Sequence, residues 1–297
     1  MSTQADSSES QAIRSEIADL EKRLQDANAR LKSTGANGEV ISSSPTKVLQ
    51  SDGPLSASSH HFLLLLADSA LPLGSFAFSS GLESYLAHTR PSSSFPAFLD
   101  FSLSSYASTT LPFVLAAHRK PEDLVDLDDA LDAAIMCTVG RRASVAQGRA
   151  LLSIWDRSFS SALPSGVLAS AVDSLEEFAG LMKSASLNVS SDLPPVSAHL
   201  GPLFGAIACI LGMSLQQTAY VFMLSHVKAL LSAAVRASIF GPYHAQKMLA
   251  SVEVQEGIQR VIDQQWNAKI EDAGQSVPVM DLWIGRHEML YSRIFNS

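Results

Sequence analysis

Apolar positions recur with a helical period along most of the chain from His60 onward. No stretch alternates between apolar and polar residues for long enough to predict a strand, and no internal repeat is apparent. The pattern therefore predicts a single all-α domain over residues 60–297, with residues 188–195 as a loop. The predicted helical stretches are 121–136, 141–162, 167–186, 196–212, 214–240 and 243–269.

Several residues predict where these helices begin and end. Proline and two acids follow one another at 121–123, as is typical of the first turn of a helix. Ser214 is a good helix N-cap, while Gly212 and Gly241 stand where helices are expected to stop.

The first 59 residues form an extension with a different pattern. A stripe of apolar residues over about 11–33 has the alternating spacing of four and three that is typical of a coiled coil. Such a short helix needs a partner or a second copy of itself to persist, or else it lies as an amphipathic helix on the body of the protein. Residues 34–59 are rich in Ser, Gly and Pro and predict a flexible linker. The stripe consists of Ile13, Ile17, Leu20, Leu24, Ala27 and Leu31.

The composition limits the function. Of the 297 residues 46% are hydrophobic and only 17% are charged, so the surface is either rich in Ser or covered in part by partners. A net charge of −8 argues against nucleic acid as a ligand, because no excess of Lys and Arg is available to neutralise phosphates. Cys137 and Cys209 lie far apart, which excludes a disulfide framework and a thiolate-rich metal site and favours a reducing compartment.

No segment predicts a membrane span or a secretory signal. The longest apolar stretches, 203–213 and 218–224, are too short to cross a bilayer. The N-terminus lacks a basic region followed by an apolar one, and its acidic residues argue against a transit peptide. We therefore expect a cytoplasmic protein without membrane contact.

The common catalytic motifs are absent from the sequence. It contains no phosphate-binding loop with a Gly-Lys pair, no GxGxxG and no HExxH. Residues 77–81, Ala-Phe-Ser-Ser-Gly, approach the nucleophile elbow of serine hydrolases and make Ser79 the alternative catalytic residue. That motif requires a strand before the serine, whereas Pro72 and Gly74 break the chain there. The favoured interpretation is a protein that is not an enzyme.

Charged residues cluster on two neighbouring segments. The acidic residues between 122 and 132 are interpreted as the solvated face of a helix, since they have mixed spacing and no aligned His. The arginines between 141 and 157 carry the opposite charge, so we expect the two segments to pair within the fold rather than to bind a charged partner.

Two further features point to contacts with other helices. In residues 71–83, Pro72 and Gly74 predict a turn before Phe76 and Phe78, which could form a hydrophobic staple or an interface. In residues 193–246 the formal charges are Lys228 and Arg236 alone. Arg236 stands among small apolar residues, so we expect a buried guanidinium that pairs with a carboxylate or with carbonyl groups at a helix–helix interface.

Four blocks of the sequence resemble, in order along the chain, the motifs of the UreF family of urease accessory proteins, particularly its eukaryotic form. The first reads LLLADSALPLGSFAFSSGLE at 64–83, although Phe78 stands where the family often has His or Tyr. The second reads RASVAQGR at 142–149. A third combines HLGPLFG at 199–205 with Ala234-Val-Arg236 and Gln246, and the last reads HEMLYSRIFNS at 287–297. The resemblance covers residues 62–297 and leaves out the N-terminal extension.

The resemblance implies an all-helical accessory protein without catalytic activity of its own. It implies a homodimer that binds a UreD protein (also called UreH) through its C-terminal region and neighbouring helices. The pair then recruits the GTPase UreG, which delivers nickel to apo-urease. It also implies that no cofactor is tightly bound and that nickel is handled by the complex. A direct nickel-binding chaperone is the other alternative, and it would need clustered His, Cys or carboxylate ligands. The interface candidates are Phe76, Phe78, Glu83, Arg236, Gln246, Tyr291, Arg293 and Phe295.

Overall fold

The computed structural model describes residue 22 and residues 57–89, 93–163, 168–187 and 195–296. These residues are helical or irregular, and no strand occurs among them, so the prediction of an all-α fold is confirmed. The chain divides into two units, residues 1–53 and 54–297. The predicted coiled-coil helix and most of the linker lie outside the described residues. The first described helix of the second unit, α2, begins at Ala57, three residues before the predicted start of the domain.

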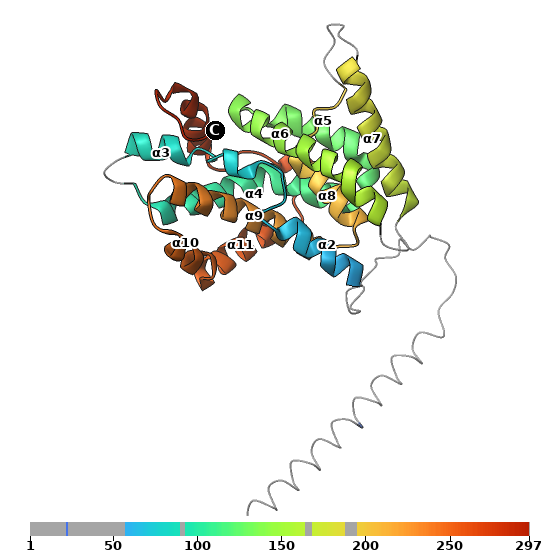
Figure 1. Ribbon diagram of the computed structural model, residues 1–297, viewed down its shortest axis with the longest axis horizontal. Helices are drawn as coiled ribbons and strands as arrows, with labels where there is room; N and C mark the ends of the chain where they lie inside the picture. The colour runs from blue at the N-terminus through green and yellow to red at the C-terminus, as the bar shows by residue number, and fades with distance from the viewer. Residues whose placement is uncertain (1–21, 23–56, 90–92, 164–167, 188–194, 297) are drawn as a thin grey trace, which may run out of the picture. The chain divides into compact units, whose positions relative to one another are not determined.

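The described part of the second unit is built from helices (Figure 1). The α-helices are α2 (Ala57–Ala67), α3 (Leu82–Thr89), α4 (Phe95–Arg119), α5 (Leu124–Ala134), α6 (Thr138–Ile154), α7 (Ala169–Leu187), α8 (Leu200–Ile210), α9 (Leu215–Arg236), α10 (Pro242–Leu249), α11 (Val252–Gln265) and α12 (Pro278–Arg286). The shorter helical turns are η1 (Ser75–Ala77), η2 (Pro121–Asp123), η3 (Trp155–Phe159), η4 (Ser160–Ala162), η5 (Ile270–Asp272) and η6 (His287–Met289).

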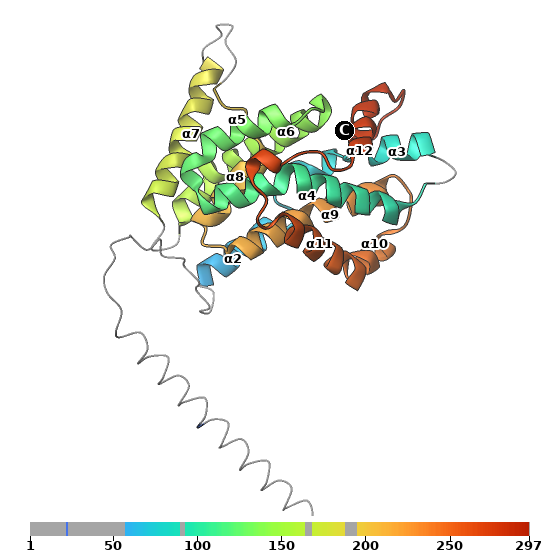
Figure 2. The same ribbon diagram turned by 180° about the vertical axis from the view of Figure 1, so that it is seen from behind.

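Helix α4 runs through the middle of this unit and packs against α8, α9 and α11, as both ribbon views show (Figure 2). Most of its residues are buried, so its sequence lacks the separate apolar and polar faces that are typical of a surface helix. Pro112 inside the helix cannot donate to the Ser108 carbonyl. The backbone N–H of Gly274 donates to that carbonyl instead, at 3.1 Å. The helix therefore keeps its length because another segment satisfies the freed group.

The helix boundaries confirm some predictions and correct others. The Ser214 side chain accepts a hydrogen bond from the N–H of Gln217, whose side chain in turn accepts from the Ser214 N–H, so the predicted cap is confirmed. Gly241 does not end a helix: α9 stops at Arg236, and Gly241 is the N-cap of α10. The predicted stretch 243–269 is two helices, because Ser251 caps the start of α11.

Among the described helices, α9 is long and apolar enough to cross a membrane by length and composition alone. Of its most apolar window, 61% is buried within the protein. It packs on α4 and also contacts α2, α10 and α11, as the core helix of a folded domain does.

Candidate protein-interaction site

Glu83, in the first turn of α3, fastens the C-terminal segment to the body of the protein. Its carboxylate lies 2.9 Å from Nε2 of His287 and accepts hydrogen bonds from the backbone N–H groups of Ile294, at 2.8 Å, and Phe295, at 3.2 Å. The N–H of Asn296 donates to the carbonyl of Ala77 at 2.8 Å. Glu83 thus joins the first and the last of the sequence blocks that resemble the family.

The glycine before α3 makes this arrangement possible. Gly81 has φ +86°, a conformation that side chains disfavour, and a Cβ there would lie 3.0 Å from the backbone nitrogen of Ile284 in α12. Helix α12 is also held by Trp283, whose ring centroid lies 4.7 Å from that of Tyr85 and 5.9 Å from that of Phe98. The turn and the aromatic packing together set the position from which the C-terminal segment starts.

Arg236, at the end of α9, lies beside two aromatic rings. Its guanidinium carbon is 4.4 Å from the ring centroid of Phe295 and 6.0 Å from that of Phe76, and its Nε donates to the Ser232 carbonyl at 3.3 Å. Arg236 is exposed, so the expected burial of its guanidinium is wrong; of its two expected kinds of partner, a carboxylate or carbonyl groups, the Ser232 carbonyl is present. Among the described residues, its contacts are therefore one carbonyl and two aromatic rings.

The structure brings four of the eight interface candidates into one cluster: Phe76, Glu83, Arg236 and Phe295. Tyr291 and Arg293 are exposed on the same C-terminal segment. Phe78 is half-buried and lines a partly open cavity. Gln246 is exposed on α10, and no hydrogen bond or ion pair among the described residues connects it to the cluster.

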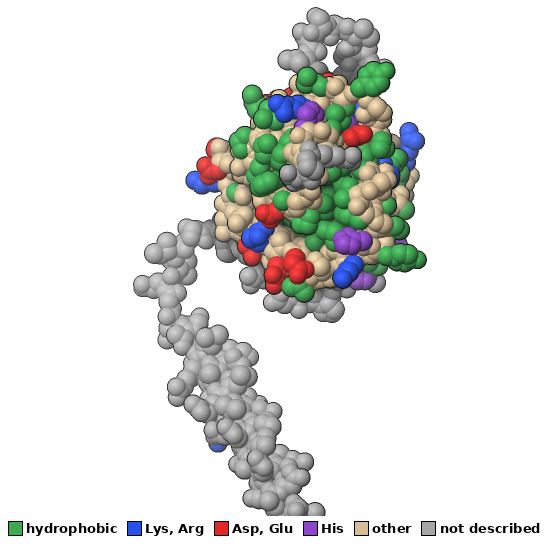
Figure 3. Space-filling model, turned by 90° about the vertical axis from the view of Figure 1, so that its left-hand side faces the viewer, with side chains coloured by type: hydrophobic (Ala, Val, Ile, Leu, Met, Phe, Trp, Pro, Cys, Tyr) green, Lys and Arg blue, Asp and Glu red, His purple; other side chains and the backbone are tan. Residues whose placement is uncertain are grey.

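Large apolar side chains are exposed around this cluster, and we call them the terminal apolar face. Phe76 is 67% exposed and Tyr291 is fully exposed. Figure 3 shows hydrophobic side chains gathered on the end of the molecule that carries α3, α10 and the C-terminal segment. Apolar surface that is gathered rather than scattered marks a contact with another molecule. The face comprises Phe76, Leu282, Met289, Tyr291 and Ile294.

Sequence reasoning missed several members of this site. His287 was read as part of a motif, yet its role as the partner of Glu83 depends on two residues 204 positions apart. Leu282, Met289 and Ile294 were not singled out. The sequence does indicate them, because each is a large apolar residue that follows a charged one near the C-terminus.

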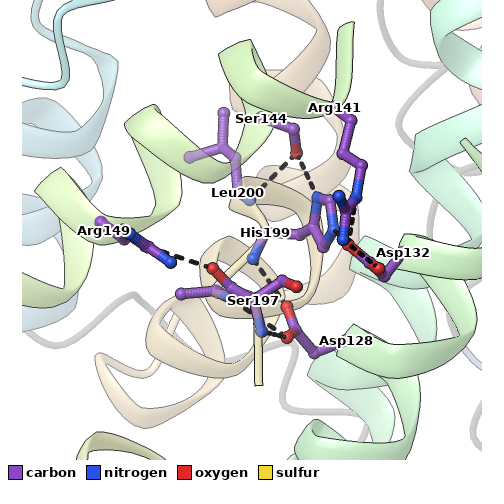
Figure 4. A network of polar contacts seen from close by, with 9 residues as sticks. Asp128, Asp132, Arg141, Ser144, Arg149, Ser197, His199 and Leu200 are labelled. Atoms are coloured by element: carbon purple, nitrogen blue, oxygen red, sulfur yellow. Dashed lines mark hydrogen bonds and ion pairs between the residues drawn. The ribbon is translucent and has the colours of Figure 1, made fainter. Parts of the chain in front are cut away.

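A second polar network lies where α5, α6 and the start of α8 meet (Figure 4). The Asp128 carboxylate accepts hydrogen bonds from three consecutive backbone N–H groups, those of Ser197 at 2.7 Å, Ala198 at 3.0 Å and His199 at 2.6 Å. Asp128 is fully buried, so the interpretation of the acidic cluster as a solvated face is wrong at this position. A buried carboxylate is tolerated here because the N–H donors replace its water.

The same network contains the ion pair that charge patterning predicted. Arg141 donates to both oxygens of Asp132, through Nε at 2.6 Å and Nη2 at 2.5 Å, which confirms pairing between the acidic and basic segments. These hydrogen bonds from Arg141 lower the pKa of Asp132 to about 2, with a smaller contribution from His199. His199 is fully buried; its Nε2 lies 2.8 Å from Asp132, and its Nδ1 lies 3.0 Å from Oγ of Ser144.

Close packing in this network explains the glycine of the second motif. A Cβ on Gly148 would lie 2.1 Å from the carbonyl oxygen of Ala198, so no side chain fits between α6 and the turn that precedes α8. Ala198 itself has φ +69°, an uncommon conformation that the hydrogen bonds to Asp128 hold in place.

The structure does not support the serine-hydrolase alternative. Ser79 is fully buried, and the described residues before it form α2, turns and η1 rather than a strand. Ser144, His199 and Asp132 lie in hydrogen-bonded order, but the N–H of Leu200 donates to Ser144, and Arg141 neutralises Asp132. This arrangement ties helices together. Within the described part of the chain, no group of three or more His, Cys, Asp or Glu side chains is placed to hold a metal ion.

Comparisons with known proteins agree with these motifs. The family model named UreF matches residues 90–253. An uncharacterized urease accessory protein UreF-like of Schizosaccharomyces pombe is 36% identical over 239 residues, which cover 80% of this chain and 97% of that protein. Urease accessory protein F of Arabidopsis thaliana is 32% identical over 78% of this chain and 90% of its own. Urease accessory protein UreF of Paenarthrobacter aurescens is 30% identical over 82% of this chain and all of its own length.

Proposed function

Since this chain belongs to the UreF family of urease accessory proteins, we propose that it serves urease maturation as a non-catalytic adaptor in the cytoplasm. It forms a homodimer, binds a UreD (UreH) protein and recruits the GTPase UreG, so that nickel reaches apo-urease. Nickel is cargo of the complex in this proposal, and this chain holds no tightly bound cofactor.

The observation that carries the proposal is the terminal apolar face, assembled on the segment that Glu83 fastens. Exposed Phe, Tyr, Leu, Met and Ile side chains lose water-accessible apolar surface when a partner covers them, which favours association. A few aromatic and Arg anchors dominate such interfaces, and Arg236 lies against two aromatic rings at the edge of this one.

The hydrogen bonds to Glu83 give the face a defined shape before binding. Three donors from the last part of the chain meet one carboxylate, so the backbone around Ile294 and Phe295 is held in place. A surface that is already ordered binds with a smaller loss of conformational entropy than one that must fold on contact. We therefore assign Glu83 a positioning role and place the contacts themselves on Tyr291, Ile294 and Phe76.

Co-expression with candidate UreD and UreG proteins tests the proposal. We expect the three proteins to co-purify, and we expect the double variant Tyr291→Ala, Ile294→Ala to lose most of the complex on gel filtration while its circular dichroism stays unchanged. Leu168→Ala is the control, because Leu168 is 62% exposed and directly precedes α7, on the opposite side of the domain in Figure 1. Failure of the wild-type protein to bind either companion, or an unchanged complex in the double variant, contradicts the proposal.

A further inference from the structure

A partly open cavity of about 400 Å³ is hollowed into the domain, and none of the residues of the terminal apolar face lines it. Its walls come from α4, α6, α9 and α12 and from the segment around η1. The volume falls within the range of small-molecule sites, which begins at roughly 300 Å³. Neither the predicted adaptor role nor the surface described above uses this space.

One wall of the cavity is a flat aromatic stack. The ring of Tyr106, from α4, lies parallel to that of His226 with the centroids 4.1 Å apart, and also parallel to that of Phe222 at 5.2 Å. Ser102 fixes the imidazole, since its Oγ lies 2.9 Å from Nε2 of His226. These contacts leave the wall little rotamer freedom, so a ligand ring can pack on it without a large entropy cost.

Polar groups without a protein partner also reach the cavity. Among the described residues, the hydroxyls of Tyr106, Ser80 and Ser225 and the Nδ1 atom of His226 have no hydrogen-bond partner, although all four residues line the cavity. These four atoms also remain accessible to solvent, whereas the unpartnered Nδ1 of His287 is buried. They are therefore available to a guest molecule in the cavity or to water.

The lining carries almost no charge. Its one formally charged side chain is Asp281, whose Oδ1 already accepts a hydrogen bond from Nε2 of Gln275 at 2.9 Å. Burial lowers the pKa of His226 to about 3 and raises the pKa of Tyr106, so both are neutral at pH 7. A charged guest would lose its water here and find no opposite charge in return.

We propose that this cavity is a binding site for an uncharged small molecule that combines a flat apolar ring with a hydrogen-bonding group. The ring packs on the Tyr106–His226 wall, and its polar edge meets the unpartnered hydroxyls and the Nδ1 of His226. Apolar area, one aromatic wall and a few convergent polar groups are the general features of small-molecule sites.

Two probes that share one skeleton test the choice of an uncharged guest. N-phenylnaphthylamine is neutral and fluoresces in apolar surroundings, and anilinonaphthalene sulfonate is its sulfonated counterpart. With the full-length protein we expect saturable binding of the neutral probe at one molecule per chain, and binding of the sulfonate that is weaker by about ten-fold or more. Equal affinity for the two probes, or no saturable binding of the neutral one, overturns the proposal.

A pair of variants on α9 tests the location. Ala229→Phe puts a ring into the cavity and should abolish saturable binding of N-phenylnaphthylamine, whereas Ser232→Phe, at an exposed position of the same helix, should leave it unchanged. If Ala229→Phe fails to fold, Ser225→Leu, which also points a larger side chain at the cavity, carries the test. Binding that survives in the folded cavity variant overturns the proposal. Binding lost in Phe76→Ser instead would place the probe on the terminal apolar face and overturn it equally.

Discussion

Two buried histidines, His199 and His287, each contact a carboxylate, but their surroundings differ. Both ring nitrogens of His199 have partners, Asp132 and Ser144, and its backbone N–H is bound by Asp128. His287 contacts Glu83 through Nε2, while its buried Nδ1 has no hydrogen-bond partner among the residues that the structure describes. Buried polar groups are usually all satisfied, and an unsatisfied one lowers local stability.

The two histidine sites therefore have different roles: the His199 network joins core helices, and the Glu83–His287 contact attaches the C-terminal segment. The His199 network holds three helices of the core together. Of the eight residues labelled in Figure 4, Arg149 is exposed, four are half-buried and three, Asp128, His199 and Leu200, are buried. The Glu83 contacts hold one chain segment that carries exposed apolar side chains. We infer that the C-terminal segment opens at a lower free energy than the core, as segments that meet partners commonly do.

The largest effect is expected at Asp128. Asp128→Ala leaves three backbone N–H groups buried without an acceptor, so we expect the free energy of unfolding to fall by about 3 kcal/mol or more. Urea unfolding followed by circular dichroism measures it. Asp129→Ala, one residue along α5 and exposed, should change the free energy of unfolding little. If Asp128→Ala lowered the free energy of unfolding as little as Asp129→Ala, the hydrogen bonds to Asp128 would not be what stabilises this region.

A pH dependence is expected from Asp132. Its pKa in the folded protein is about 2, below the ordinary value of 3.8, so the folded state binds this proton less readily than the unfolded state does. The stabilisation is therefore complete above about pH 4 and is lost as the pH falls towards 2; it amounts to about 2 kcal/mol. Urea unfolding at a series of pH values should show this slope in the wild type and a shallower one in Asp132→Asn. Identical slopes contradict the assignment to Asp132.

A smaller effect on folding is expected at Glu83. Glu83→Ala should cost about 1.5 kcal/mol and should raise amide hydrogen exchange in residues 287–296 while the core helices stay protected. Asp100→Ala removes an exposed ion pair with Arg260 outside this segment and serves as the control without a measurable change. If amide exchange in the C-terminal segment stayed unchanged in Glu83→Ala, the inference that Glu83 holds this segment would be contradicted.

The smallest effect on folding is expected at Arg236. Arg236→Ala removes a contact with the Phe295 ring that is worth below about 1 kcal/mol at an exposed site. If Arg236 anchors a partner, the variant should bind its UreD companion about five-fold or more weakly, measured by titration of the purified proteins. Arg260→Ala, an exposed arginine paired with Asp100, is the control. An unchanged affinity with normal folding contradicts an anchor role for Arg236.

The sequence predicted those helices whose signals are local. Ser214 and Gln217 lie three positions apart, and their reciprocal cap follows from the residue types alone. Helix α4 was not singled out, because a helix buried on nearly all sides shows no polar face and Pro112 argues against a continuous helix. Its start could have been recognised from Ser94, which caps the helix two residues before Pro96.

The buried role of Asp128 could not be read from the sequence. In the sequence Asp128 is one carboxylate among several. Its hydrogen-bond donors, the N–H groups of residues 197–199, lie 69 to 71 positions later in the chain, so no local charge pattern indicates them. The same holds for the cavity, since its Tyr106–His226 wall joins two helices that are far apart in sequence.

By itself the sequence determined the helical class, the approximate positions of several helices, the shortage of charge and the order of the family motifs, because caps and helical periodicity act over a few residues. Only the tertiary structure decided that residues 76–83, Arg236 and the C-terminal segment form one site. The hydrogen bonds from Ile294 and Phe295 to Glu83 span 211 and 212 positions. Contacts of that range depend on how every intervening helix packs, and no local pattern encodes this.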